Sequence, residues 1–336
     1  MAMLKRRVSM SAALSRIALL VASLGLFTNT GALAIAQGFP TRTVKLIVAV
    51  PAGGVTDAMA RIVAQRLTES WGQTVVVENR PSANYAAGAQ AVAVSPPDGL
   101  TLLVAPDATV TASPHLFGKL PYNPLKELTP IAVLCRITPV LAINPLLPVH
   151  NVPELIALAK AKPGSLSYGS FGVGHYSHLS MEDFKQRTGT DILHIPYRGA
   201  PQATVALMTG DVDVELTPLS SVEPHERDGK IRIVAAAGEK RALLRPDLQT
   251  VAEQGVPGFS TTGWFALWGP ANMPADLVRK INADVGKVLD LPQSREFFRT
   301  NSFERVDLTP DQFGQLVQGD FEHWGALIKS VGVKLD

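Results

Sequence analysis

The chain has one cysteine in 336 residues and few charged residues. The single thiol, Cys135, excludes an internal disulfide, so the hydrophobic cores alone must stabilise the fold. Charged residues make up 18% of the sequence, and this low fraction with many aliphatic residues suits buried parallel strands covered by helices. Because Cys135 lies in the apolar run IAVLC, we predict a buried side chain instead of a reactive thiol.

Clusters of basic residues are also lacking once residues 1–36 are set aside. This segment holds four of the 31 basic residues and no acidic one, which leaves 27 basic against 29 acidic residues in the rest. No run of Lys and Arg stands on one predicted element, so we expect no nucleic-acid partner.

Residues 1–36 have the three parts of a secretory signal peptide. Residues 5–7 are basic, and residues 17–27 form an uncharged apolar run that is too short to span a bilayer as a helix. Residues 34–36 supply the small side chains of a cleavage site. The sequence therefore predicts export, with a mature chain that starts near Gln37. A membrane anchor and twin-arginine export are the alternatives.

The mature chain of about 300 residues exceeds one core, so two domains are expected. Apolar strand patterns at residues 44–50, 74–78 and 100–105 alternate with helical patterns that run to about Ser70 and over residues 86–94. We expect Gly72 and Gly210 to end helices and Pro153 to lie in the first turn of another. The alternation then returns, with extended segments expected at residues 131–143, broken by Pro139, and at residues 166–168, 192–196, 212–216 and 231–236. Such alternation predicts an α/β fold with ligands at the carboxyl ends of the strands.

The first candidate binding loop is PAGGVTD, residues 51–57. Gly53 and Gly54 let a ligand approach the backbone closely, and Thr56 or Asp57 can cap the helix that follows. Bare amides at a helix start bind anions. A plain tight turn with a cap is the alternative interpretation of the same residues.

The second candidate loop is YGSFGVGHYSH, residues 168–178, which also precedes a helix. His175, His178 and Glu182 could share a helix face, so a metal site is one alternative to one histidine capping and one packing. A hydrolase with Ser170 as nucleophile and His175 or His178 as base is another, but no oriented aspartate is evident.

The third candidate loop is YRGAPQ, residues 197–202. Pro201 presets a helix start and leaves the next amides free, and Arg198 could pair with a carboxylate. Three amide-bearing helix starts without a paired catalytic acid and base indicate a cleft for a small anion.

These loops and their neighbours resemble the periplasmic solute-binding receptors of tripartite tricarboxylate transporters, the Bug family, over nearly the whole mature chain. The matching segments, in order, are FPTRTVKLIVAVPAGGVTDAMAR, VVVENRP, PPDGLTLLVA, the Gly169–Leu179 loop, IPYRGAPQA, LLRPDLQTVAEQGVPGF and WFALWGPA. Each segment is moderately specific, and their shared order and spacing make a chance match improbable.

The resemblance implies an α/β, two-lobed periplasmic binding protein, type II-like, with a mainly parallel sheet flanked by helices in each lobe. Two crossing strands would join the lobes, and the ligand cleft would lie between them. We expect lobe I at residues 38–138 plus 262–336 and lobe II at residues 139–261. The family's usual ligands are small carboxylates, which the receptor encloses and delivers to a membrane permease.

The family's P-x-G-G-x-x-D loop maps onto residues 51–57, and its second-lobe glycine loop maps onto residues 170–179 with His175 in place of a hydroxyl residue. The chain departs from the family at Asn84 and Tyr85, which bring bulk to a segment that is usually rich in glycine. It also has Thr217 where an aspartate is often found. The first departure favours a flat, aromatic ligand, and the second disfavours an amino acid.

The predicted ligand-binding residues come from both lobes. They are Gly53, Gly54, Thr56, Asp57, Asn84, Tyr85, Asp107, Ser170, Gly174, His175, Tyr176, Ser177, Tyr197, Gly199 and Thr217. We expect a monomeric periplasmic receptor with no catalysis, cofactor or resident metal, whose partners are the ligand and the permease subunits. A sensor-kinase ectodomain as docking partner is the first alternative, and the Ser/His hydrolase is the second.

Overall fold

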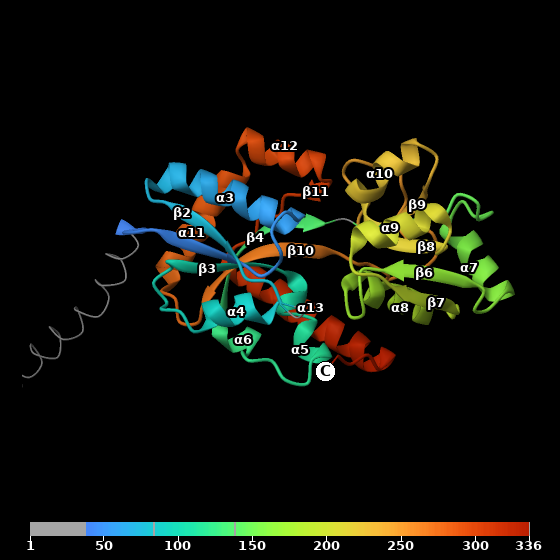
Figure 1. The fold of residues 1–336 in the computed structure, drawn as a ribbon, viewed down its shortest axis with the longest axis horizontal. Coiled ribbons are helices and arrows are strands. Elements are labelled where there is room, and N and C mark those ends of the chain that lie inside the picture. Colours follow the sequence, from blue (N-terminus) through green and yellow to red (C-terminus); the bar gives the residue numbers. More distant parts are fainter. Residues whose placement is uncertain (1–37, 83–84, 138, 336) are drawn as a thin grey trace, which may run out of the picture.

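A computed structural model gives the fold of residues 38–82, 85–137 and 139–335 (Figure 1). The predicted signal peptide and the predicted site residue Asn84 lie outside these ranges. Two sheets form the centres of two lobes. Lobe I is the sheet that contains β1 to β4, β10 and β11 with its helices, and lobe II is the sheet of β5 to β9 with its helices.

The sheet of lobe I has the strand order β11-β4-β10-β3-β1-β2. β1 pairs in parallel with β2 and β3, whereas β10 runs antiparallel to β3 and β4. The strands are β1 (Val44–Val48), β2 (Val75–Asn79), β3 (Thr101–Pro106), β4 (Leu128–Ile137), β10 (Gly263–Pro270) and β11 (Phe303–Glu304). The helices are α3 (Val55–Trp71), α4 (Ala86–Ala93), η1 (Asp107–Thr109), α5 (Ser113–Leu116), α6 (Pro124–Glu127), α11 (Ala275–Leu289), α12 (Pro292–Thr300) and α13 (Pro310–Val331).

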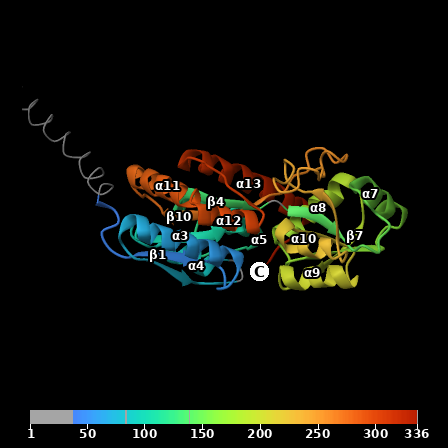
Figure 2. The same ribbon diagram turned by 90° about the horizontal axis from the view of Figure 1, so that it is seen from above.

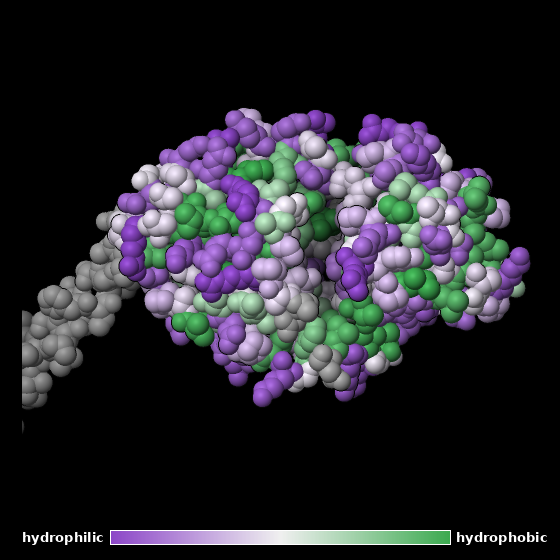
Figure 3. Space-filling view, viewed as in Figure 1, coloured by the Kyte–Doolittle hydropathy of each residue, from purple (hydrophilic) through white to green (hydrophobic). Residues whose placement is uncertain are grey.

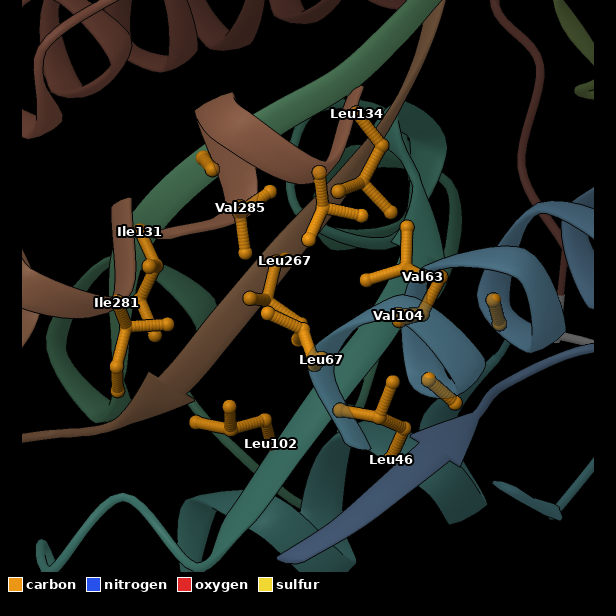
Figure 4. Close-up of a cluster of buried hydrophobic side chains, with 14 of the residues drawn as sticks. Leu46, Val63, Leu67, Leu102, Val104, Ile131, Leu134, Leu267, Ile281 and Val285 are labelled. Carbon is orange, nitrogen blue, oxygen red and sulfur yellow. The ribbon is translucent and has the colours of Figure 1, made fainter. Parts of the chain in front are cut away.

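Side chains that alternate along β1 divide lobe I into two cores. Leu46 and Val48 point to the face covered by α3 and α11, and Ile47 points to the face covered by α4 and α13. Figure 4 shows the first core, where apolar side chains of four strands and both helices interdigitate: Leu46, Val63, Leu67, Leu102, Val104, Ile131, Leu134, Leu267, Ile281 and Val285. Both faces of the sheet are thus buried, as the aliphatic strand sequences predicted.

The sheet of lobe II has the strand order β7-β6-β8-β5-β9. β6 pairs in parallel with β7 and β8, and β5 runs antiparallel to β8 and β9. The strands are β5 (Pro139–Ile143), β6 (Leu166–Ser170), β7 (Ile192–Pro196), β8 (Val214–Pro218) and β9 (Arg232–Ala236). The helices α7 (Val152–Ala161) and α8 (Tyr176–Thr188) cover one face, and α9 (Ala200–Thr209) and α10 (Leu219–Arg227) cover the other.

The chain crosses between the lobes twice within the sheets. It passes from β4 directly to β5, and it returns to lobe I before β10 (Figure 1). The long extended stretch predicted at residues 131–143 is therefore two strands that belong to different sheets. Figure 2 shows the lobes side by side along the long axis, and the space-filling view shows a hollow between them (Figure 3).

Helix α13 adds another contact between the lobes. Its Trp324 packs in one apolar cluster with Leu116 of α5 and Leu179 of α8. Near its end, the Ser330 side chain hydrogen-bonds Gln186 of α8, 3.0 Å away. Lobe II therefore rests on the C-terminal helix of lobe I as well as on the crossing strands.

Several local predictions are confirmed. Gly72 is the C-cap of α3 and Gly210 that of α9, and both glycines adopt the left-handed conformation, with φ of 66° and 83°. Pro153 lies in the first turn of α7, and Cys135 is buried in the core of lobe I. Within the described ranges, no helix is both long and apolar enough to cross a membrane.

Candidate functional site

The turn before α3 presents free backbone amides at the carboxyl end of β1. Gly54 is the N-cap in an extended conformation and carries no capping side chain, which corrects the expectation that Thr56 or Asp57 caps this helix. Among the described residues, the amides of Gly54, Val55 and Thr56 have no hydrogen-bond acceptor. The start of a 17-residue helix thus offers unpaired donors and the positive end of the helix dipole.

Asp57 shapes this turn from inside. Its carboxylate accepts hydrogen bonds from Arg61 Nε, from the Gly53 amide and from Asn79 Nδ2, each at 2.9 Å. The bond from Arg61, helped by the other two, lowers the pKa of Asp57 to about 2 although the side chain is buried. Because its oxygens are engaged by these donors, Asp57 holds Gly53 in its left-handed conformation, with φ of 88°.

Tyr85 lines the cleft on the side of lobe I, and the carboxyl group of Asp107 lies near enough to act on it electrostatically. Tyr85 precedes α4 in a left-handed conformation with φ of 60°. Asp107 follows β3, is buried, and accepts a 2.7 Å bond from the Ala108 amide. Burial, with the nearby Asp320 carboxylate, raises the pKa of Asp107 to about 7. An acid that is partly protonated near neutral pH can donate a hydrogen bond to a ligand as well as accept one.

The glycine loop between β6 and α8 uses many of its own donors. The Phe171 amide donates to Ser177 Oγ at 3.0 Å, and the Gly174 amide donates to His178 Nδ1 at 3.0 Å. His175 caps α8, since its Nδ1 accepts from the Ser177 amide. The loop therefore presents fewer free amides than the sequence suggested.

Two amides of this loop remain available. Within the described chain, those of Val173 and Tyr176 have no acceptor. The Tyr176 hydroxyl is likewise buried without a partner. Burial, with the charges of Glu215 and Asp107, raises the pKa of Tyr176. Its hydroxyl therefore stays protonated and can donate.

Ser170 does not pair with His175 or His178, the partners considered from the sequence. Its Oγ lies 2.6 Å from Nε2 of His194, a β7 residue that the motifs did not single out. His178 accepts from Gly174, and Glu182 binds the Tyr168 hydroxyl and Lys185. The three residues of the candidate metal site are thus engaged elsewhere, and the described ranges contain no group of three or more side chains placed to hold a metal ion.

The third loop is tied to the second. The Tyr197 amide donates to the Ser170 carbonyl at 2.9 Å, and Gly199, with φ of 124°, precedes α9. A Cβ at Gly172 would lie 3.7 Å from the Tyr197 carbonyl oxygen. Arg198 is exposed beside this turn. The two lobe II turns predicted to bind ligand are therefore in direct contact.

Thr217, another predicted site residue, is fully buried in lobe II. Its hydroxyl on β8 is buried without a hydrogen-bond partner in the described chain. Two residues earlier on the same face, Glu215 is also fully buried; Thr204 of α9 donates to one of its oxygens at 3.1 Å. Burial raises the pKa of Glu215 to about 8. This neutral acid was missed because the sequence VDVEL gives no sign of which way Glu215 points.

A pocket of about 210 Å³ lies between the lobes. Tyr85, Ala108 and Leu116 line it from lobe I, and residues 171–175 line it from lobe II. Burial lowers the pKa of His175 to about 4, so this wall is uncharged at neutral pH. The pocket is the crevice that the two-lobed prediction requires, whereas two larger hollows of about 610 and 580 Å³ lie on lobe I.

The candidate site thus has two parts, the free amides at the start of α3 and an uncharged pocket between the two lobes. A family model described as "Tripartite tricarboxylate transporter family receptor" matches residues 59–333. The chain belongs to this family. The receptor is 33% identical to Protein BugT of Bordetella pertussis over 320 residues, which cover 94% of this chain and 98% of BugT.

Solved structures agree with this family relationship. The receptor is similar to R. palustris Rpa4515 with adipate, with a TM-score of 0.77 and 32% identity over 88% of this chain and 99% of that one. It is also similar to MatC from Rhodopseudomonas palustris with bound malate, with a TM-score of 0.72 and 30% identity over 86% of this chain and 100% of that one. The predicted two-lobed α/β fold and the Bug-family resemblance are thereby confirmed.

Proposed function

We propose that this receptor captures a small carboxylate between its lobes in the periplasm and delivers it to the membrane subunits of a tripartite tricarboxylate-type transporter. The observation that carries the proposal is the set of free amides at the start of α3, at the edge of the sheet that faces lobe II. Anions bind at such helix starts. Adipate and malate, bound by the two similar proteins, are both dicarboxylates.

The carboxylate would bind at the amides of Gly54, Val55 and Thr56, with further bonds from the lobe II loop. The remaining carbon skeleton would lie toward the pocket walled by Tyr85 and His175. Because this pocket is uncharged and includes the apolar side chains of Leu116, Phe171 and Val173, we propose a ligand with an apolar body and an anionic end. Ligands of this size commonly need several such polar contacts and the exclusion of water to reach micromolar affinity, about 8 kcal/mol.

We propose lobe boundaries at residues 138–139 and 261–262, with closure as a hinge motion about these crossings. Residues 1–36 would direct export and be removed, and the receptor would act as a monomer. We propose that the cleft performs no catalysis. Ser170 is fully buried, and within the described chain the ring of His194 has no carboxylate partner to orient it as a base.

The test is a Gly54→Leu variant compared with Gly319→Ala. A Cβ at Gly54 meets no atom within 4 Å, and its φ of −83° suits any residue, so the fold tolerates leucine. The leucine would stand beside the free amides and obstruct a carboxylate. Gly319 is a matched open position on α13.

A thermal-shift panel of mono-, di- and tricarboxylates first identifies a ligand for the wild-type protein, because ligand bound only to the native state raises Tm. Calorimetry should then show an affinity loss of at least about tenfold for Gly54→Leu, the size expected from losing one charged hydrogen bond. Gly319→Ala should bind as the wild type does. Equal affinities in all three proteins would remove the helix start of α3 from the site.

A further inference from the structure

Three aromatic rings stack behind the lobe II loop. The His194 ring lies between Tyr168 and His178, with centroid distances of 4.8 Å and 4.0 Å and interplanar angles of 16° and 13°. We call these three side chains the ring stack. The rings come from β6, β7 and α8, so the stack joins three elements of the lobe.

The sheet register builds the ring stack. Tyr168 on β6 is paired directly with His194 on β7, which places the two rings on the same face. Leu193 and Ile195 on either side of His194 are exposed on the opposite face. His178 approaches from α8, which covers the inner face.

Each ring of the stack also makes a hydrogen bond. His194 Nε2 lies 2.6 Å from Ser170 Oγ, at the start of the glycine loop. His178 Nδ1 accepts from the Gly174 amide at 3.0 Å, at the middle of the loop. The Tyr168 hydroxyl donates to Glu182 at 2.6 Å, and Glu182 is paired with Lys185 at 2.7 Å. The stack is thus held by Glu182 on one side and hydrogen-bonds to the glycine loop at two points.

We propose that His178 and His194 are positioning residues for the glycine loop. His194 holds Ser170 and His178 holds Gly174. The backbone amides of Val173 and Tyr176 thereby stay free for the ligand. This inference rests on the proposed function, because it assigns the loop a ligand to receive. Neither histidine touches that ligand in this arrangement. They act through the loop, whose glycines have no side chains to fix its shape.

The bond from Gly174 requires a neutral His178, since a protonated Nδ1 cannot accept. Burial and the neighbouring His194 lower the pKa of His178 to about 4, with Glu182 opposing this shift and Lys185 adding to it. Burial likewise lowers the pKa of His194, which faces the same Glu182 and Lys185. The ring stack is therefore uncharged at neutral pH, and its two hydrogen bonds to the glycine loop are intact.

Matched substitutions separate the rings from their hydrogen bonds. His178→Phe keeps a stacking ring and loses the acceptor for Gly174, whereas His178→Asn places an amide oxygen near the position of Nδ1. His194→Phe loses the partner of Ser170, whereas His194→Gln places an amide near the position of Nε2. His150→Asn is the control, because His150 is exposed on a distant loop.

The first measurement is amide hydrogen exchange of residues 171–177 in the ligand-free proteins. Both Phe variants should exchange at least about tenfold faster than the wild type, as expected for a lost buried hydrogen bond. His178→Asn and His194→Gln should return most of this protection, and His150→Asn should show no change. The second measurement is carboxylate affinity, which should fall in the same order.

Unchanged exchange in both Phe variants would overturn the inference, and so would Asn and Gln variants that exchange as fast as the Phe variants. Faster exchange with unaltered affinity would also overturn it, since the hydrogen bonds from the two histidines would then not contribute to ligand binding. If the wild-type protein bound no carboxylate, the proposed function would fail. The ligand-free exchange would still decide whether the two histidines hold the loop.

Discussion

The carboxylate of Asp57 and the backbone amide of Gly53 are joined by a 2.9 Å hydrogen bond that closes the turn before α3. The same carboxylate binds Arg61 on the helix and Asn79 at the end of β2. One buried acid therefore links the turn, the helix and the neighbouring strand. The free amides of the site owe their direction to this side chain, which does not itself need to touch a ligand.

Asp57→Ala should lower the free energy of unfolding by about 1–3 kcal/mol at pH 7, since it removes three hydrogen bonds made by one buried carboxylate. The folded-state pKa of Asp57 is about 2 against 3.8 for the free group, so its contribution is present above pH 3.8 and disappears as the pH falls through 2. Urea denaturation at several pH values measures both effects. Arg61→Ala should cost less, because Arg61 is half exposed and the bonds from Gly53 and Asn79 remain; an equal loss would contradict this role.

Glu215→Gln should stabilise the protein above neutral pH. Burial raises the pKa of Glu215 from 4.5 to about 8, so the folded state binds a proton that the unfolded state releases. Stability from this group is full below pH 4.5 and declines as the pH rises through 8, by up to about 1.4 kcal/mol per pH unit. Denaturation between pH 5 and 9 should show this decline in the wild type and in exposed Glu239→Gln, and a flatter profile in Glu215→Gln. Parallel profiles would show that Glu215 is ionised in the folded protein.

Gly174→Ala should weaken the contact between the lobes. A Cβ at this position would lie 2.7 Å from Cδ1 of Leu116, and φ of 81° disfavours any side chain. We expect a lower Tm and weaker ligand binding. Adding Leu116→Ala to this variant should restore the part of the loss that comes from the steric clash. The part that comes from the strained backbone at residue 174 should remain. A double-mutant cycle in Tm and in affinity separates the two contributions. Strict additivity of the two substitutions would mean that the lobes do not meet here in solution.

The elements of the fold were largely predictable because their signals are local. Apolar runs marked the strands, and glycines such as Gly72 and Gly210 marked helix ends, since each signal depends on a few neighbouring residues. The segment at residues 131–143 was harder. Its apolar pattern fits one long extended stretch, and Pro139 marked the break, but only the packing shows that the two parts belong to different sheets.

The partners within the site could not be predicted in the same way. His194 binds Ser170 and Glu215 lies beneath α9 because separate strands pair in a particular register. A motif describes residues that are close in sequence. His194 and Ser170 are far apart in sequence, and so are Glu215 and its partner on α9. The alternation of His194 with apolar Leu193 and Ile195 was the available signal, since it indicates that the imidazole faces away from them.

The packing of α13 against α8 limits how the receptor can open. Trp324 and Leu179 share a buried cluster, so separating the lobes on that side would expose both side chains to water. Among the described residues, no comparable apolar cluster joins the lobes on the opposite side. The hinge motion proposed at the two crossing strands should therefore separate the lobes least on the side of the C-terminal helix. The lobes would separate most where α3 and α9 begin, and a solute would enter and leave the cleft on that side.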